Sequence, residues 1–249
     1  MKTKPLYLDD SYLKEMDADV LEVLPEGEGV FRLILDQTVF YPMGGGQATD
    51  QGKLEADNWS GEVYQVLNKQ SLLSRKLENR DGEIWHFIKT SGTPAVGAKV
   101  HGSINWDRRY KNMKLHSAGH IIDFAMFLLG LSPKILVPLK ADHNKNPHII
   151  YQGTLEEDIK QKLEDRTNEL VAKNLKLTWY FQPLEDLQKE AIYLIPGLPT
   201  NKPLRTLKLE GVGAVADGGT QVKTTGEVGK INIESIEKED GLTIIRYSI

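Results

Sequence analysis

The feature that most constrains this chain is a pair of histidines, His116 and His120, four residues apart in the sequence. On a helix, two such residues share one face about 6 Å apart along the axis, so their neutral ring nitrogens can converge on one divalent ion. Two imidazoles do not complete a metal site. The best source of further ligands is Asp217–Gln221, which is rich in glycine and carries a carboxylate and a carboxamide four residues apart. A fold that uses all these groups must bring two distant segments into one pocket.

Composition limits the class of protein. The chain has 249 residues, 40% of them hydrophobic, which is enough for a core in one domain or in two smaller ones. It contains no cysteine, which excludes disulfide partners and thiolate ligands within the chain and fits a reducing compartment. No signal peptide is visible, and the longest apolar run, Ile121–Leu131, contains Asp123 and is too short to span a membrane. We therefore expect a cytoplasmic protein without membrane association.

The first part of the chain has the pattern of short strands separated by turns. Apolar residues dominate Val30–Leu35, Val63–Leu67 and Ile84–Ile88, and segments rich in glycine and polar residues lie between them. Many short strands with turn signals indicate a small barrel or sandwich. His86 alternates with two aromatic residues, and we expect it on the exposed side of the barrel. This first domain is predicted to cover residues 1–106.

The second part mixes helices with strands. Apolar spacing predicts a helix over Arg108–Leu129, with Gly130 as its C-cap. A second helix is expected to begin at Thr154, because Glu157 would complete a capping box before an apolar stripe. Four further segments are predicted strands: Leu177–Phe181, Arg205–Leu209, Lys230–Ile236 and Leu242–Ser248. The predicted fold class is α+β, with a barrel domain followed by an α/β sandwich over residues 107–249 that packs helices on an antiparallel sheet.

The net charge and the local charge of this chain point in opposite directions on nucleic-acid binding. The net charge of −4 argues against a dedicated nucleic-acid binder. A basic cluster that includes Arg108 and Arg109 nevertheless lies just before His116, and a partner that touches one face needs only such a local cluster. These residues are either phosphate contacts or ordinary solvated charges. His143 and His148 lie in a polar segment and are expected at the surface.

Three blocks of this sequence resemble the editing domain of alanyl-tRNA synthetases and its free-standing AlaX relatives. The blocks are the glycine-rich segment Phe40–Gly52, the pair in His116–His120, and Asp217–Gln221 followed by Thr224–Gly229. The resemblance implies a β-barrel domain before an editing domain, zinc as cofactor and acylated tRNA as partner. In that family a Cys-x-x-x-His motif completes the zinc site that the histidine pair begins.

This chain departs from the family at the second metal motif, where Asp217 and Gln221 occupy the cysteine and histidine positions. A carboxylate is a competent zinc ligand, whereas a neutral carboxamide oxygen is a poor one beside imidazole. The candidate set His116, His120, Asp217 and Gln221 is therefore expected to bind metal less tightly than the family's set. Weak zinc binding, a harder ion and a metal-free site remain open. In a metal-free site, Asp217 would pair with the substrate's ammonium group and a histidine would orient or activate water.

The glycine-rich segment has two interpretations. The resemblance implies that the loop with Gly44, Gly45 and Gly46 folds over the editing pocket, and that Gln47 contacts the 3′ end of the acylated tRNA. Thr220 matches a threonine of the family motif, and we count it among the substrate-binding candidates. No Gly-Lys-Ser/Thr follows the glycines, so a nucleotide-binding P-loop is unsupported and the other interpretation is a tight hairpin bend.

The resemblance and the residues together predict a trans-editing hydrolase. It would remove serine or glycine from tRNA specific for alanine, with His116, His120 and Asp217 as the catalytic group. The first alternative is a noncatalytic tRNA-binding relic of the editing domain that has lost its metal. A third possibility is hydrolysis of some other acylated small molecule.

Overall fold

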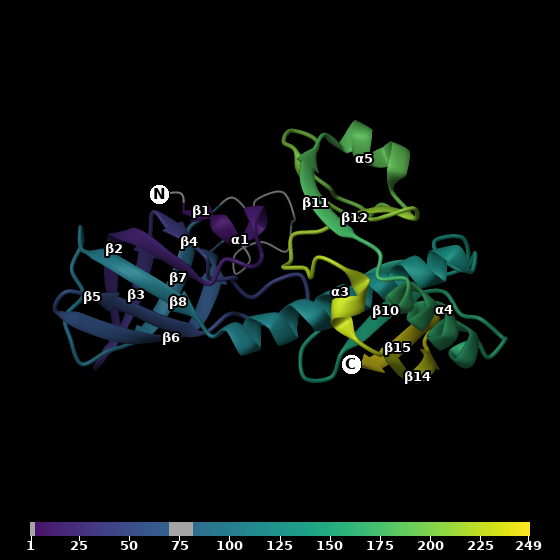
Figure 1. Ribbon diagram of the computed structural model, residues 1–249, viewed down its shortest axis with the longest axis horizontal. Coiled ribbons are helices and arrows are strands. Elements are labelled where there is room, and N and C mark those ends of the chain that lie inside the picture. The colour runs from purple at the N-terminus through teal and green to yellow at the C-terminus, as the bar shows by residue number, and fades with distance from the viewer. Residues whose placement is uncertain (1–2, 70–81) are drawn as a thin grey trace. The chain divides into compact units, whose positions relative to one another are not determined.

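The computed structural model describes residues 3–69 and 82–249 of the chain (Figure 1). Its packing divides the chain into two compact units. The first, here called the barrel unit, contains Met1–Gly44 and Ala48–Tyr110, and the second, here called the site unit, contains Gly45–Gln47 and Lys111–Ile249. The predicted α+β class is confirmed, because both units combine helix with antiparallel sheet.

The barrel unit is built on a closed barrel in the strand order β2-β3-β7-β6-β5-β8, and every neighbouring pair is antiparallel. The strands are β2 (Glu15–Gly27), β3 (Val30–Leu35), β5 (Gly52–Ala56), β6 (Trp59–Asn68), β7 (Ile84–Lys89) and β8 (Lys99–Ile104). Short β1 (Lys4–Pro5) pairs in parallel with β4 (Gln37–Thr38), and α1 (Leu6–Asp9) follows β1. The barrel predicted from short strands and turn signals is therefore present.

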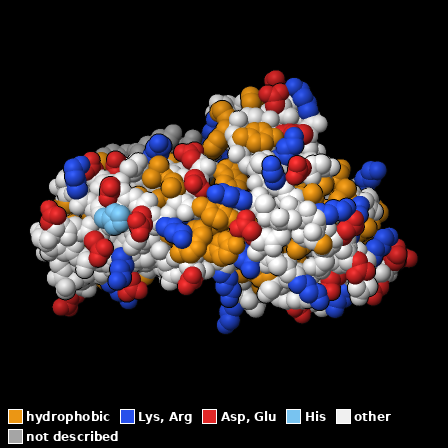
Figure 2. Space-filling model, in the orientation of Figure 1, with side chains coloured by type: hydrophobic (Ala, Val, Ile, Leu, Met, Phe, Trp, Pro, Cys, Tyr) orange, Lys and Arg blue, Asp and Glu red, His pale blue; other side chains and the backbone are white. Residues whose placement is uncertain are grey.

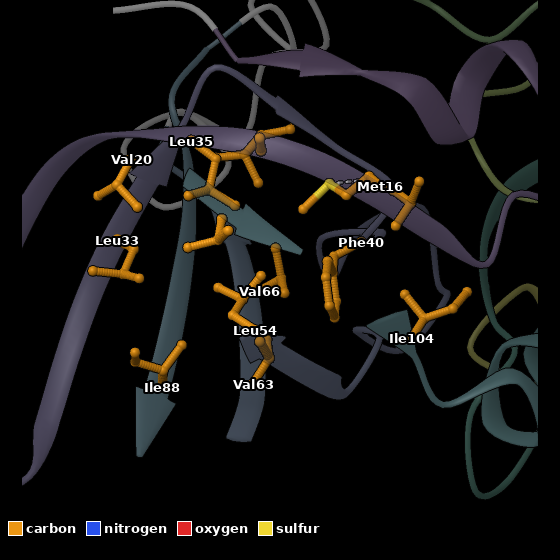
Figure 3. Close-up of a cluster of buried hydrophobic side chains, with 14 of the residues drawn as sticks. Met16, Val20, Leu33, Leu35, Phe40, Leu54, Val63, Val66, Ile88 and Ile104 are labelled. Atoms are coloured by element: carbon orange, nitrogen blue, oxygen red, sulfur yellow. Dashed lines mark hydrogen bonds between the residues drawn. The ribbon is translucent and has the colours of Figure 1, made fainter. Parts of the chain in front are cut away.

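Apolar side chains fill the barrel. Figure 3 shows them pointing inward from several strands, among them Val20, Leu33, Leu54, Val63 and Ile88, each at most 1% exposed. Alternation along the strands accounts for this, since every second side chain faces the interior. Burying an aliphatic side chain of this size contributes about 1.5–3 kcal/mol, so closure of the sheet is driven by these residues.

His86 was expected on the exposed side of the barrel, and this expectation is wrong. Its side chain is fully buried on the inner face of β7, while its neighbours Trp85 and Phe87 are only partly buried. The ring nitrogens are satisfied inside the barrel, with Nε2 at 2.8 Å from the hydroxyl of Thr38 and Nδ1 at 3.4 Å from the carbonyl oxygen of Leu33. A buried histidine is tolerated here because it is hydrogen-bonded in its neutral form.

Burial of His86 predicts an acid-sensitive barrel. Burial lowers the pKa of His86 from 6.5 to about 4, so the folded barrel resists a proton that the unfolded chain accepts. Its contribution to stability is therefore complete above pH 6.5 and is lost as the pH falls toward 4, by about 3 kcal/mol. Urea unfolding at a series of pH values should show this extra loss in the wild type relative to His86→Asn. Equal pH dependence in the two proteins would contradict it.

Helix α3 (Trp106–Leu128) links the two units along the chain. Its first turn is capped by Asn105, whose Oδ1 accepts a hydrogen bond from the Arg108 amide at 3.0 Å. It ends at Leu128, and Gly130 two residues later has a φ of +72°, in the left-handed region that glycine favours after a helix. The predicted helix Arg108–Leu129 and its C-cap match these bounds to within two residues.

The site unit contains two antiparallel sheets in place of the single sheet that we expected. One has the order β14-β15-β10-β9 and the other β11-β12-β13. The strands are β9 (Val137–Asp142), β10 (His148–Gln152), β11 (Leu177–Gln182), β12 (Leu204–Leu209), β13 (Gly213–Ala216), β14 (Asn232–Glu239) and β15 (Leu242–Ser248). Helix α4 (Lys160–Ala172) packs on β14, and α5 (Leu184–Glu190) packs on β12 and β13.

The predicted start of the second helix is wrong. Helix α4 begins at Lys160, and Thr154 lies outside it. The N-cap position is Ile159, which has no side-chain cap, and the Asp158 carboxylate before it accepts a hydrogen bond from the Lys160 amide at 2.9 Å. The apolar stripe is correct from Ile159 onward, and Ile159 itself is buried at the helix start.

Two observations bear on partners. Within residues 3–69 and 82–249, no helix combines the length and the apolar character needed to cross a membrane. On the face drawn in Figure 2, Lys and Arg side chains are interspersed with Asp and Glu and do not form one basic tract. This mixing agrees with the small net charge.

Candidate metal centre

The histidine pair and Asp217 meet in the site unit. His116 and His120 lie one turn apart on α3, and both are buried, at 2% and 9% exposed. Asp217 follows β13 directly, and its amide donates to the carbonyl oxygen of Arg205 on β12, so the strand pairing fixes its place. One ligand atom from each of His116, His120 and Asp217 lies within 4.8 Å of the other two. The spatial arrangement predicted from the sequence is therefore present for these three residues.

The two imidazoles approach the same carboxylate oxygen. Nε2 of His116 and Nε2 of His120 each lie 3.4 Å from Oδ1 of Asp217. The rings are nearly parallel, with 5.0 Å between their centroids and 20° between their planes. These two nitrogens and one oxygen lie close enough together to bind one ion, as a two-histidine, one-carboxylate metal site requires.

Gln47 fixes the orientation of His116. Its Oε1 lies 2.8 Å from Nδ1 of His116 and also accepts the Thr220 amide at 3.1 Å, while its Nε2 donates to Oγ1 of Thr220 at 2.7 Å. Since Oε1 can only accept, Nδ1 of His116 carries the proton and the Nε2 lone pair faces Asp217. Gln47 is 1% exposed and orients His116 from inside the protein, and the contact with the 3′ end of tRNA that the resemblance implies stays a prediction.

The other oxygen of Asp217 is held by two donors. Arg205 donates from Nη1 to Oδ2 at 3.1 Å, and Gln221 donates from Nε2 to the same oxygen at 3.0 Å. The Gly219 amide donates to Oδ1 at 3.0 Å. These donors leave Oδ1 directed at the imidazoles.

Gln221 reaches the site in a role that differs from the predicted one. Its carbonyl oxygen accepts a hydrogen bond from the Ser117 hydroxyl at 2.6 Å, and its amide nitrogen faces Asp217. A nitrogen that donates to a carboxylate offers no lone pair to a metal. In this arrangement Gln221 orients the candidate ligand Asp217.

Two glycines are required by close approaches at the site. A Cβ on Gly219 would lie 2.0 Å from Cε1 of His116, so no side chain fits between the segment after β13 and the ring. Gly46 has a φ of +78°, and a Cβ there would lie 2.5 Å from the carbonyl oxygen of Ala141. The glycines therefore permit the tight packing that brings Gln47 and Asp217 to the imidazoles.

His143 was expected at the surface, and this expectation is wrong, since the residue is only 4% exposed. Its ring stacks on His116 with 4.5 Å between centroids, and its Nδ1 lies 2.5 Å from the hydroxyl of Tyr247. Its amide also donates to the carbonyl oxygen of Gly46 at 2.8 Å. The polar residues around it in sequence gave no sign of this burial. His148 is partly buried and takes no part in these contacts. Its Nδ1 lies 2.9 Å from the carbonyl oxygen of Asn146.

Of the remaining substrate-binding candidates, Gly45 belongs to the site unit and the other three belong to the barrel unit. Arg109 is fully buried, with its guanidinium bonded to both carboxylate oxygens of Asp50 and to two carbonyl oxygens. It is therefore unavailable to a phosphate, and the expectation for Arg109 is wrong. Arg108 is partly buried and donates from Nε to the carbonyl oxygen of Thr49. Gly44 also belongs to this unit and accepts a hydrogen bond from Tyr41.

Comparison with known proteins identifies the family. The chain is 36% identical to the alanyl-tRNA editing protein AlaX-M of Saccharolobus solfataricus, over 99% of both chains. This chain belongs to the alanyl-tRNA editing protein family. The family described as class II (A) tRNA synthetases also matches, over residues 12–108.

Longer relatives share the same region with this editing-family chain. It is 30% identical to the alanine–tRNA ligase of Thermococcus kodakarensis and 29% identical to that of Halobacterium salinarum, in each case over 99% of the chain. It spans only 26% of the length of each ligase. The editing-family chain thus corresponds to about a quarter of such an enzyme.

Electrostatics in this member of the editing family favour an ionised Asp217. Burial alone would raise the pKa of Asp217, but the adjacent imidazoles of His116 and His120 outweigh burial and hold it well below its usual value. Burial lowers the pKa of His116. Burial also opposes protonation of His120, yet the carboxylates of Asp217 and Asp123 outweigh it and raise the pKa of that ring. In the metal-free site these shifts in pKa favour an ionised Asp217, a neutral His116 and a His120 that is protonated more readily.

The residues present fit a divalent metal. The Nε2 lone pair of His116 faces a carboxylate oxygen, an arrangement of two acceptors that a cation between them would satisfy. Both ring nitrogens of His120 are buried without a hydrogen-bond partner. His116, His120 and Asp217 together offer two imidazole nitrogens and one carboxylate oxygen. Zinc and other borderline ions use ligands of these kinds.

Several residues at this site escaped the sequence analysis. Arg205, Ser117 and Asp123 were not identified, because each lies in an apolar helix or strand pattern that explains its neighbours without it. Spacing could have indicated Asp123, which follows His120 by three residues and so shares its helix face. No sequence signal distinguishes Arg205, whose importance comes from strand pairing.

Proposed function

We propose that this chain is a trans-editing hydrolase that deacylates tRNA charged with the wrong amino acid, with Ser- or Gly-tRNA for alanine as substrates. The observation that carries the proposal is that ligand atoms of His116, His120 and Asp217 lie within 4.8 Å of one another. Full-length similarity to a protein named for alanyl-tRNA editing supports the substrate class. The same substrate supports a cytoplasmic location, where aminoacyl-tRNA is used.

Each residue has a defined task in this proposal. His116, His120 and Asp217 hold a divalent metal, with zinc as the proposed ion. A bound metal of this kind polarises an ester carbonyl or lowers the pKa of a bound water. Gln47 keeps the Nε2 lone pair of His116 directed at the site. Arg205 and Gln221 keep Asp217 in place from its other oxygen.

The contacts of Asp217 favour ligation over direct capture of the substrate's ammonium group. Its Oδ2 already receives Arg205 and Gln221, and the positive charge of Arg205 would repel an ammonium at that side. Its Oδ1 receives the Gly219 amide and faces the imidazoles. That amide is therefore engaged with the carboxylate and is not free to stabilise an oxyanion.

Deacylation of purified mischarged tRNA tests the proposal. Protein incubated with zinc should release serine or glycine from tRNA for alanine, and should leave correctly charged Ala-tRNA largely intact. The matched control is His148→Ala, because this histidine lies outside the ligand group and should turn over at the wild-type rate. No hydrolysis of any mischarged tRNA, with zinc or with manganese, would overturn the proposal.

The same assay separates the enzyme from the noncatalytic relic. A relic would bind acylated tRNA in a filter-binding experiment yet leave the ester intact. The ordered donors around Asp217 favour the enzyme, because they maintain a ligand geometry that a relic does not need.

Arg108 stays a proposed phosphate contact, and charge reversal there should weaken tRNA binding.

A further inference from the structure

A second buried carboxylate lies one helical turn beyond the candidate ligands. Asp123 is on α3 and only 6% exposed. Its Oδ1 accepts a hydrogen bond from the hydroxyl of Tyr151 on β10 at 2.5 Å, and its Oδ2 accepts one from Tyr193 at 3.0 Å. Tyr193 follows α5, so β10 and the segment after α5 each supply one hydroxyl to this carboxylate of α3. Such a construction exceeds what helix packing alone requires, since an apolar residue would fill the same space.

The ring of His120 lies between two carboxylates. Its Nε2 is 3.4 Å from Oδ1 of Asp217, and its Nδ1 is 3.8 Å from Oδ2 of Asp123. Neither nitrogen has a hydrogen-bond partner, although both are buried. A buried polar atom left without a partner is destabilising, so a small shift that closes the gap to Asp123 is favourable.

The two sides of the ring have different tasks. Nε2 faces the point that His116 and Asp217 also face, whereas Nδ1 faces away from that point toward Asp123. Asp123 therefore lies behind the ring and does not contact the reacting atoms. A carboxylate behind a metal-bound imidazole holds the proton on the nearer nitrogen and leaves the farther one as a lone pair.

We propose that Asp123 is a positioning residue for His120. It accepts the Nδ1 proton of that ring and so directs the Nε2 lone pair at the ligand group. Tyr151 and Tyr193 hold the carboxylate in place, as Thr220 holds Gln47 for the other histidine. The importance of this contact for activity rests on the proposed function. The tautomer of the His120 ring can be tested independently of that function.

Nitrogen-15 NMR of the metal-free protein tests the tautomer directly. The spectrum is recorded on histidine-labelled protein at alkaline pH, where imidazoles are neutral, with the His120 signals assigned from the His120→Ala variant. We expect the neutral ring of His120 to carry its proton on Nδ1. A proton on Nε2 overturns the proposal, whether or not the protein hydrolyses tRNA.

Zinc affinity provides the second readout. Asp123→Asn preserves the shape of the side chain and should weaken zinc binding about 10- to 100-fold in a chelator competition, and Tyr193→Phe should weaken it less. The control is Asp165→Asn, an exposed aspartate of α4 that should bind zinc as the wild type does. Wild-type affinity in Asp123→Asn overturns the proposal. If the wild type itself binds no zinc, the metal role in the proposed function fails, and the tautomer decides the inference about Asp123.

Discussion

His116→Ala and His120→Ala are each expected to lower kcat/KM for deacylation of mischarged tRNA by about 10³-fold or more. The physical reason is that each change removes one of three ligand atoms that lie within 4.8 Å of one another. A metal contributes several kcal/mol to the transition state of ester hydrolysis, and each 1.36 kcal/mol is a factor of ten in rate. Release of labelled serine from tRNA, measured at saturating zinc, gives the ratio of the kcat/KM of each variant to that of the wild type.

The control for this loss is the fold of the variants. Both histidines lie on helix α3 and alanine favours helix, so both variants should keep the far-ultraviolet circular dichroism of the wild type. Asp217→Ala should lose activity in parallel, because it removes the third ligand atom. Near-wild-type turnover in either histidine variant would contradict the assignment of the catalytic group.

Asp50→Ala is expected to lower the free energy of unfolding by about 3–5 kcal/mol. Asp50 and Arg109 form an ion pair in the barrel unit in which both side chains are fully buried. Nε of Arg109 donates to both carboxylate oxygens, at 3.1 and 2.9 Å, and the Tyr41 amide donates to Oδ2 at 2.7 Å. Removing the carboxylate leaves a buried guanidinium without its counter-charge, which is the costly half of a buried pair. Urea denaturation measures the difference.

An exposed pair of the same unit provides the control. Lys99 and Asp19 are 2.8 Å apart with side chains 86% and 47% exposed, so Asp19→Ala should cost no more than about 1 kcal/mol. The double variant Asp50→Ala, Arg109→Met should recover part of the lost stability, since no charge is then left unpaired. Equal destabilisation by Asp50→Ala and Asp19→Ala would contradict this account of the pair.

The sequence predicted the bounds of the strands better than the burial of the polar residues inside them. β3 has the predicted bounds Val30–Leu35, where an apolar run becomes fully buried in its second half. β15 matches Leu242–Ser248, and burial alternates along it. His86 shows the limit of that reasoning. Large aromatic neighbours suggested that it faces outward, yet Thr38 and a carbonyl oxygen satisfy it inside the barrel. Alternation separates two faces but does not tell which one is buried.

The candidate site was predicted in part, and for a similar reason. Spacing on one helix placed His116 and His120 on one face, and a family motif identified Asp217. Gln221 is predicted to be a ligand because it occupies a ligand position in that motif. In the structure the carbonyl oxygen of Gln221 accepts a hydrogen bond from the Ser117 hydroxyl instead. His143 depends on contacts with residues far along the chain, which local composition does not encode. Motifs thus locate a site, and hydrogen bonding assigns the roles within it.

Metal content is the most direct test of this account. The protein should be purified without chelator, and zinc, manganese, iron and cobalt should be measured together by mass spectrometry in the wild type and in His116→Ala. The account predicts about one ion per wild-type chain and a marked loss in the variant, because three ligands define one site. A wild-type protein that contains none of these metals, and that binds none when they are added, would contradict the claim that His116, His120 and Asp217 form a metal centre.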